Sequence, residues 1–359
     1  MSSKLRVAVI GCGIGKSHVA GFASMPDCFD VLVVCDTNET RANDLARSAG
    51  IPRVCTDLAD VLAMNDIDVV DIVTPPGAHY TQALQVLAAN KHCICEKPLV
   101  GSLREVDDLI MAEARSGKRM MPIFQYRYGN GLQKLKLLVD SGIAGRAFVS
   151  TVEMAWRRRA DYYAIPWRGK YESDLGGAVN GLAVHLLDEL TYVLGPVKSV
   201  FARTKTMVNP IETEDCAVAT MDMADGSLAT LAVTLGSSVQ LSRHRICFSN
   251  MVAESNTQAY ANSRDPWTFS GDTPELQQQI DAALAGFTPQ TEGYAGQFER
   301  YYRAMQAGSD LPVTLADSRR AIELVTALYK SAHSGRPVSL PLRKDGWYNG
   351  WRAFMTAPS

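Results

Sequence analysis

The sequence lacks the features that mark several classes of protein. Its formal net charge is only −2 over 359 residues, so no basic surplus points to nucleic acid or to an anionic membrane. It contains no apolar run long enough to span a bilayer, and we expect no signal peptide ahead of the first strand. Its eight cysteines include no CxxC pair and no spacing typical of a metal site. We therefore expect a cytoplasmic protein with reduced thiols and no metal, nucleic-acid or membrane partner.

The sequence does contain an ordinary globular composition and a clear alternation in its first third. The apolar fraction is 47% and the charged fraction 21%, and the length suggests about two domains. Apolar strand-like runs alternate with helical patterns, and the runs lie at residues 6–10, 31–35, 69–73, 92–95 and 120–124. This spacing predicts βαβ units in a right-handed parallel sheet, an α/β, doubly wound Rossmann domain over residues 1–125.

The first strand-like run leads into a glycine-rich turn. Gly11, Gly13, Ile14 and Gly15 precede a helical pattern, and such a turn lets backbone N–H groups approach a pyrophosphate at the positive end of a helix. The usual GxGxxG spacing places Lys16 where a third glycine would stand, so we expect a shortened or irregular turn. Glycine turns also occur for backbone reasons alone, so this turn predicts a cofactor site only together with its surroundings.

Asp36 follows the second strand-like run, 25 residues after Gly11. An acidic side chain at this place can accept hydrogen bonds from both hydroxyls of an adenosine ribose, and it would repel a 2′-phosphate. No arginine follows directly, since Thr37 and Asn38 do. We therefore predict NAD as the cofactor, with NADP less favoured. The alternative is that Asp36 only caps the helix that begins near Glu39.

Two further turns follow strand-like runs and carry residues with useful chemistry. Thr74, Pro75 and His79 come after the run at 69–73, and Glu96-Lys97-Pro98 comes after the run at 92–95. The carboxyl ends of parallel strands form the edge of the sheet at which ligands bind. We predict that Lys97 is a catalytic residue beside the cofactor and that Thr74, Pro75, His79 and Glu96 line the cofactor site. The alternative for His79 is that it only begins a helix.

After Phe124 the pattern changes from alternating strands and helices to a series of strands. Asp225-Gly226 is a hairpin turn signal between two of them. A run of strands after βαβ units predicts a separate α+β domain over residues 126–359. We expect its last helix, at about 315–334, to pack back on the first domain. The strand-like runs of this domain lie at 147–155, 197–205, 216–223, 227–235 and 243–248, and helical patterns lie at 129–141 and 293–307.

One helical pattern of the second domain combines a histidine and an acid. It is entered through Gly176-Gly177 and places His185 and Asp188 three residues apart, on one helix face. Histidine is the natural side chain to take a hydroxyl proton near neutral pH. We predict that His185 is the catalytic proton acceptor and that Asp188 orients the imidazole or binds a substrate hydroxyl. The alternative is that His185 is a hydrogen-bonded core histidine.

Cationic and aromatic side chains in two other segments are candidates for substrate binding. Arg127 either binds a substrate hydroxyl or carboxylate or pairs across the domain boundary. Tyr163, Trp167 and Arg168 belong to a segment rich in arginine and aromatic residues. Such side chains suit the faces and hydroxyls of a sugar, and arginine also suits an anionic group. We predict all four as substrate-binding residues, and the alternative for the segment is a solvated or interface loop.

The glycine turn at 11–15, Asp36, Thr74-Pro75-Pro76 and Glu96-Lys97-Pro98 together resemble the family of glucose–fructose oxidoreductase, inositol dehydrogenase and MocA (Gfo/Idh/MocA). Residues 316–321 and 334–338 resemble that family's closing helix and tail, so the resemblance covers nearly the whole chain. It implies reversible oxidation of a secondary hydroxyl of a sugar, a sugar derivative or a cyclic polyol by a nicotinamide cofactor. It also implies a large, open, mostly antiparallel sheet in the second domain. Because an uncovered sheet face needs burial, we expect a homodimer or homotetramer through that sheet.

The sequence departs from the family pattern in the stretch that carries His185. The family carries Asp-x-Gly-x-His-x-x-Asp there, and His185 and Asp188 match it, whereas Gly181 replaces the first acid and Ala183 replaces the middle glycine. The loss of the acid implies altered substrate recognition. Two other functions stay open: an aldose–aldose oxidoreductase that recycles a tightly bound cofactor, and a cofactor-sensing regulator without catalysis.

Overall fold

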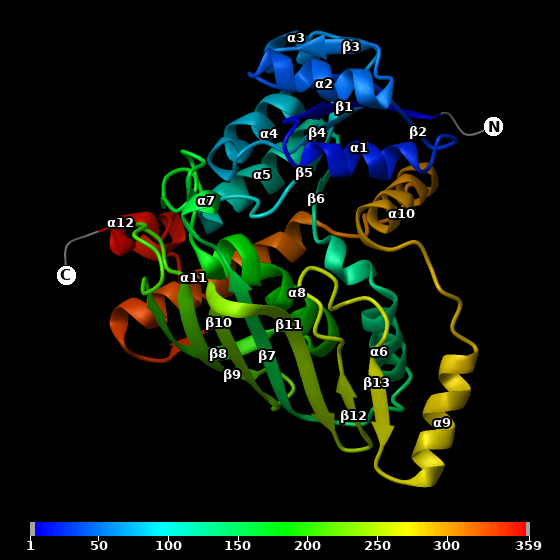
Figure 1. The fold of residues 1–359 in the computed structure, drawn as a ribbon, viewed down its shortest axis with the longest axis vertical. Coiled ribbons are helices and arrows are strands. Elements are labelled where there is room, and N and C mark those ends of the chain that lie inside the picture. Colours follow the sequence, from blue (N-terminus) through cyan, green and yellow to red (C-terminus); the bar gives the residue numbers. More distant parts are fainter. Residues whose placement is uncertain (1–3, 357–359) are drawn as a thin grey trace. The chain divides into compact units, whose positions relative to one another are not determined.

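The computed structural model describes residues 4–356, and the chain divides into two compact units (Figure 1). The first unit contains the residues up to Phe124 together with Gly293–Arg319. The second contains Gln125–Glu292 and the residues from Arg320 onward. Each unit is built on a sheet of its own.

The sheet of the first unit has six strands in the order β3-β2-β1-β4-β5-β6, and all its pairings are parallel. The inner strands are nearly continuous runs of buried Val, Ile, Ala and Cys, as expected for a parallel sheet covered on both faces. The order reverses between β1 and β4, which gives the predicted doubly wound topology. The strands are β1 (Leu5–Ile10), β2 (Phe29–Cys35), β3 (Arg53–Cys55), β4 (Val69–Ile72), β5 (His92–Cys95) and β6 (Met120–Pro122).

Helices of the first unit begin and end at recognisable signals. In α5, Ser102 Oγ accepts a hydrogen bond from Glu105 N, Glu105 accepts one from Gly101 N, and Gly117 ends the helix in the left-handed region. Phe298 of α10 stacks on Phe22 of α1 with ring centroids 4.0 Å apart, so a late segment completes the core of this unit. The helices are α1 (Gly15–Ala23), α2 (Glu39–Ala49), α3 (Leu58–Leu62), α4 (His79–Ala88), α5 (Leu103–Ser116) and α10 (Gly293–Ala307).

The sheet of the second unit has eight strands in the order β13-β12-β11-β7-β10-β9-β8-β14. Its pairings are antiparallel except for β7 with β10, which confirms the predicted α+β class with a mostly antiparallel sheet. Residues 251–290, which show no clear pattern in the sequence, form β12, β13 and α9. The strands are β7 (Ala147–Arg157), β8 (Val197–Lys205), β9 (Cys216–Met223), β10 (Leu228–Thr234), β11 (Gly236–Phe248), β12 (Met251–Glu254), β13 (Thr268–Gly271) and β14 (Val338–Ser339).

The central strands of this sheet bury one face and expose the other. Met154, Met221 and Leu231 are among the buried side chains of one face, and their neighbours Thr220 and Thr230 are exposed on the other. None of the described helices has the length and apolar character that crossing a bilayer requires. The remaining helices are α6 (Asn130–Asp140), α7 (Ala160–Tyr163), α8 (Val184–Leu194), α9 (Pro274–Ala285), α11 (Leu315–Ser334), which runs from the first unit into the second, and α12 (Arg352–Met355).

Candidate functional site

The predicted cofactor residues of the first unit lie at the carboxyl edge of its sheet. Gly11 directly follows β1, Asp36 follows β2 and Glu96 follows β5, while Thr74 comes two residues after β4. Because these strands are parallel, the four turns share one edge of the sheet. The edge includes the point between β1 and β4 where the strand order reverses, which is where open α/β sheets bind their ligands.

The glycine turn has the shape of a cradle for a phosphate group. Gly11 has φ +102°, and a Cβ there would lie 2.5 Å from Val73 O. A Cβ on Gly13 would meet no described atom within 4 Å, so the space beside its backbone is open. Ile14 is half exposed at the start of α1, and no side chain caps that helix. The first N–H groups of α1 are therefore suited to a pyrophosphate.

Gly15 explains the shortened spacing of the turn. It is the first residue of α1, and a Cβ on it would lie 3.2 Å from Val9 Cγ1 of β1. The third glycine of the usual fingerprint allows this same close packing of helix on strand. Gly15 thus takes the packing role of the third glycine at a position one residue earlier in the sequence.

Asp36 is tied to the glycine turn and does not cap α2. Its Oδ2 accepts a hydrogen bond from Cys12 N at 2.8 Å and its Oδ1 accepts one from Asn38 N at 2.8 Å. The cap of α2 is Asn38, whose side chain accepts from Arg41 N. The alternative that Asp36 caps this helix is therefore wrong. The Arg41 guanidinium lies 3.2 Å from Asp36 Oδ2, a contact that the sequence did not indicate.

His79 lies between the two other turns of this edge. It is fully buried at the start of α4, with Nε2 2.8 Å from Thr74 O and Nδ1 3.0 Å from Pro98 O. Burial lowers its pKa, so the ring is neutral and donates to one carbonyl at a time. His79 thus holds the turn of Thr74 and Pro75 against the turn that contains Lys97. Thr74 Oγ1 in addition donates to Gln82 Oε1 at 2.6 Å.

Glu96 is buried directly before Lys97. Its Oε2 accepts the backbone N–H of Lys97 at 2.9 Å, and its Oε1 accepts the hydroxyl of Tyr294 at 2.6 Å. His18 Nε2 lies 3.1 Å from the same Oε1. Burial by itself would raise the pKa of Glu96, but the hydrogen bond and charge of His18 and the charge of Lys97 hold it well below its usual range.

In the second unit, His185 is near the start of α8 and is buried. Its ring stacks on Tyr126 with centroids 4.2 Å apart and an interplanar angle of 9°. Asp188, one turn later, is also buried and binds Arg127 with both oxygens, at 2.7 Å to Nε and 2.6 Å to Nη2. Arg127 therefore forms an ion pair within its own unit. Its guanidinium also lies 5.0 Å above the ring of Tyr192.

The predicted aromatic and cationic segment forms a stack of side chains around α7. Tyr163 meets Tyr162 edge to face at 5.0 Å. The Arg168 guanidinium lies 3.7 Å from the ring centre of Tyr162 and 5.1 Å from that of Trp167. The structure thus brings Tyr163, Trp167 and Arg168 together, with Tyr162 at the centre of the group.

Glu214, a buried carboxylate that we did not predict, organises the entry to α8. It accepts hydrogen bonds from Gly177 N at 3.2 Å, from Val179 N at 2.9 Å and from Tyr329 Oη at 2.8 Å. These groups shape a π-helical turn over Ala178–Ala183, directly before α8, and such turns recur at functional sites. Burial raises the pKa of Glu214 to about 7. The sequence gives no signal for this role, because the residue lies far from α8 along the chain.

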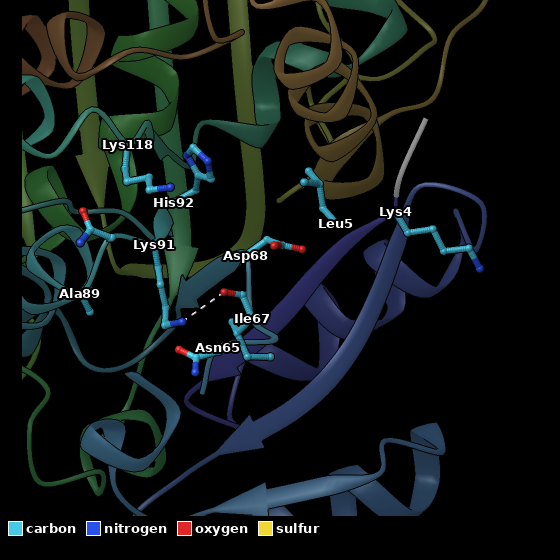
Figure 2. Close-up of a pocket in the computed structure, with 10 residues that line it drawn as sticks. Lys4, Leu5, Asn65, Ile67, Asp68, Ala89, Lys91, His92 and Lys118 are labelled. Atoms are coloured by element: carbon cyan, nitrogen blue, oxygen red, sulfur yellow. Dashed lines mark hydrogen bonds between the residues drawn. The ribbon is translucent and has the colours of Figure 1, made fainter. Parts of the chain in front are cut away.

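A hollow of about 500 Å³ in the first unit lies away from these residues (Figure 2). Leu5 and His92, which begin β1 and β5, line it together with Lys91, whose ammonium donates to Ile67 O at 3.2 Å. It therefore opens at the amino edge of the parallel sheet, opposite the glycine turn. Because cofactors of this fold bind at the carboxyl edge, this hollow is not the nucleotide site.

Comparison with known families agrees with this geometry. The model of the oxidoreductase family with an NAD-binding Rossmann fold matches residues 5–124, which run from the start of β1 to two residues past β6. The chain is thus an oxidoreductase with an NAD-binding domain. The model of the GFO/IDH/MocA C-terminal domain matches residues 132–252 of the second unit. The chain belongs to the Gfo/Idh/MocA family, and the predicted family and NAD cofactor are confirmed.

Relatives and solved structures match along nearly the whole chain. The chain is 28% identical to the inositol 2-dehydrogenase of Salmonella paratyphi B (strain ATCC BAA-1250 / SPB7), over 95% of this chain and 98% of the relative. It is 27% identical to the D-glucoside 3-dehydrogenase of Escherichia coli (strain K12), over 94% and 98%. The crystal structure of the WlbA dehydrogenase from Bordetella pertussis in complex with NADH and UDP-GlcNAcA matches with a TM-score of 0.84 and 28% identity, over 95% of this chain and 100% of that one.

Proposed function

We propose that the chain is an NAD-dependent dehydrogenase for a secondary hydroxyl of a sugar, a sugar derivative or a cyclic polyol. The observation that carries the proposal is the position of Lys97, directly after β5 and Glu96, at the sheet edge that also holds Gly11 and Asp36. A cationic side chain beside a nicotinamide is suited to stabilise charge that develops on a reacting oxygen. The names of the inositol and glucoside dehydrogenases support the substrate class.

The proposed reaction divides the work between the cofactor and two side chains. A nicotinamide cofactor held at the sheet edge of Gly11 and Asp36 would supply the acceptor for the hydride, that is, for the carbinol hydrogen with both electrons of its C–H bond. His185 takes the proton of the hydroxyl as the C=O bond forms, and Lys97 hydrogen-bonds the oxygen on which negative charge develops. In the reverse direction, His185 returns the proton to the carbonyl oxygen. His185 suits this role because imidazole exchanges a proton near neutral pH.

We further propose that residues of the second unit bind the substrate. Asp188 accepts two hydrogen bonds from Arg127 and so fixes the orientation of the guanidinium, which we propose contacts the substrate. Tyr163, Trp167 and Arg168 present aromatic faces and a cation, which suit a sugar ring and its hydroxyls. On this proposal the first unit binds the nucleotide and the second selects the substrate.

We propose NAD over NADP because of the fixed carboxylate of Asp36. Its two oxygens are held by the backbone of Cys12 and Asn38, so the carboxylate cannot easily turn away from a ribose. A 2′-phosphate would face this negative charge. The nearby Arg41 offsets it only in part, because that side chain is more than half exposed.

Stopped-flow absorbance of NADH formation with a panel of cyclic polyols and sugars tests the proposal. Lys97→Ala and His185→Ala should each lower turnover on the best substrate by about 100-fold or more. His92→Gln, a change on β5 at the opposite sheet edge, is the control and should leave turnover unchanged. Full turnover by Lys97→Ala would contradict the assignment. Nucleotide released by denaturing the purified protein would instead favour the tightly bound, recycled cofactor.

One observation favours a second candidate function, a cofactor-sensing regulator without catalysis. Gly181 lies in the π-helical turn before α8, and a Cβ on it would meet no described atom within 4 Å. The space at the Cβ position therefore does not require a glycine there. Gly181→Asp with the same polyol panel separates the two functions, because gain of turnover only in the variant would favour the regulator.

We propose that the chain forms a homodimer or homotetramer through the exposed face of the second sheet. Thr151, Thr230 and Thr220 are paired across three neighbouring strands and are exposed. Val218 and Leu228 on the same strands are 56% and 52% exposed. Thr230→Arg should reduce the mass measured by light scattering to that of one chain. Met111→Arg, at an exposed position of α5, is the control and should leave the mass unchanged.

All eight cysteines are free thiols. We propose a reducing, cytoplasmic compartment on this ground, because oxidising compartments favour disulfides.

A further inference from the structure

His18 of α1 is completely buried between two carboxylates. Its Nδ1 lies 2.8 Å from Asp71 Oδ2 of β4, and its Nε2 lies 3.1 Å from Glu96 Oε1 after β5. Asp71 is also completely buried, and Glu96 is 5% exposed. A carboxylate only accepts hydrogen bonds, so a ring that donates to both acids must carry a proton on each nitrogen. An imidazolium satisfies both contacts; burial raises the pKa of Asp71, while the charge and hydrogen bond of His18 lower it.

Aromatic side chains surround His18, and the other cation that acts on Glu96 is Lys97. The rings of Tyr294 and Phe298 from α10 lie 4.4 Å and 5.4 Å from that of His18. Asp71 Oδ1 is buried and accepts no hydrogen bond from a described residue. Burial by itself would lower the pKa of His18, but the charge and hydrogen bond of Asp71, with those of Glu96, raise it to about 9.

The contact of Glu96 with Lys97 connects this cluster to the proposed reaction. The oxygen of Glu96 that does not face His18 accepts the backbone N–H of Lys97 at 2.9 Å. The carboxylate therefore fixes the direction in which the chain leaves β5. If Glu96 lost its charge, one of its oxygens would carry a proton, and the acceptor set for His18, Tyr294 and Lys97 would be broken.

We propose that His18 is a positioning residue, which keeps Glu96 ionised and oriented so that Glu96 sets the backbone of Lys97. Asp71 holds the second proton of the imidazole and so keeps His18 cationic. The proposal rests on the proposed catalytic role of Lys97. His18 itself touches no reacting atom and acts only through Glu96.

A double-mutant cycle of His18→Gln and Glu96→Gln tests the proposal. His18→Gln should lower kcat by about 10- to 100-fold, as a misplaced catalytic group does, while the Kd for NAD changes by less than about 2-fold. Without the imidazolium, Glu96 should protonate at higher pH, so the acid limb of the kcat profile should rise by at least about one pH unit. In the Glu96→Gln background, His18→Gln should add no further loss. His92→Gln is the matched control, because it removes an imidazole from β5 at the other sheet edge.

The proposal would be overturned if the losses of kcat in the two single variants multiplied in the double variant. It would also be overturned if the acid limb of the kcat profile did not move in His18→Gln. A second measurement needs no substrate. ¹⁵N NMR of the histidine-labelled protein should show one of its six histidines as an imidazolium at pH 7.5, assigned to His18 by its loss of signal in Asp71→Asn or by through-bond assignment. A neutral His18 at that pH would overturn the proposal even if turnover were never found. Failure of Lys97→Ala to lower turnover, with a cationic His18, would instead contradict only the proposed function.

Discussion

Each unit of this chain contains a buried glutamate that contacts the backbone of the segment carrying a residue proposed to act in the reaction. The pKa values of these two glutamates shift in opposite directions. Glu96 stands before Lys97 and shares its site with the imidazole of His18, so its pKa is held well below the usual range. Glu214 shapes the turn before His185 and receives only neutral donors, and its pKa rises to about 7. Both are almost completely buried. Of these two glutamates, the one with a buried imidazole beside it therefore has a lowered pKa, and the one with neutral donors alone has a raised pKa.

The difference follows from what surrounds each acid. Two backbone N–H groups and the hydroxyl of Tyr329 stabilise the anion of Glu214, but they do not offset the loss of water around a full charge. The imidazolium beside Glu96 adds an opposite charge at 3.1 Å. The first unit can thus keep its acid ionised at any ordinary pH, and the second has an acid that titrates near neutrality.

The largest expected effect tests the close approach of the backbone at Gly177 to the backbone of Glu214. A Cβ on Gly177 would lie 1.9 Å from the backbone oxygen of Glu214. Gly177→Ala should therefore lower the free energy of unfolding of the second unit by at least about 4 kcal/mol. Chemical denaturation followed by circular dichroism measures this. The control is Gly181→Ala on the same turn, which has open space and should change stability by less than about 1 kcal/mol. Equal losses in both would contradict the close passage.

The second largest effect is the loss of stability when Glu96 can no longer carry a charge. Glu96→Gln removes one anion from the imidazolium of His18 and should cost the first unit about 3 kcal/mol at pH 7, the low end for a broken buried pair because Asp71 remains. Urea unfolding at pH 7 measures the change. Glu113→Gln serves as the control, since Glu113 accepts Met120 N at 2.7 Å and its cationic neighbour is the part-exposed Arg119 rather than a buried imidazole, so the change should cost about 1 kcal/mol. Equal losses of stability in Glu96→Gln and Glu113→Gln would contradict the stabilising role of the imidazolium beside Glu96.

The smallest effect is a pH dependence that only Glu214 should show. The folded-state pKa of about 7 lies above the ordinary value, so the stabilisation linked to its proton is complete below about pH 4 and is lost as the pH rises through 7. Between pH 5 and 7 the wild-type chain should lose about 2 kcal/mol on this account. Glu214→Gln cannot ionise, and that part of the slope should disappear. Glu212→Gln, two residues earlier in the chain, should keep the slope, and a slope unchanged in Glu214→Gln would refute the raised pKa.

The sequence was sufficient where local patterns decide the structure. The apolar runs of β1, β4 and β5 and the capping box of α5 follow from residues near one another, so the parallel sheet could be predicted. The bounds of β8 and β9 were also predicted from alternation alone. Family resemblance, rather than periodicity, indicated the open antiparallel sheet and the oxidoreductase function.

Long-range polar contacts could not be predicted, because they depend on which side chains the fold brings together. Asp71, an acid within a run of apolar residues, is the one member of the His18 contacts that the sequence marks as unusual. The partners of Glu214 come from two distant segments, at residues 177–179 and at Tyr329, and the residues next to Glu214 in the sequence do not indicate them. The ion pair of Arg127 and Asp188 likewise joins residues 61 positions apart. The packing of α10 against α1 depends on shape, which an apolar helix face does not specify.

The glycine turn has a consequence for mutational scanning of the chain. Gly11 is confined by the backbone of Val73, whereas the space beside Gly13 is open in the chain as described. Every substitution at Gly11 should therefore be lost even in a selection for folded protein alone. Substitutions at Gly13 should survive that selection and be lost only in a selection for activity. The difference between the two selections at these two positions would locate the dinucleotide without any structure of a complex.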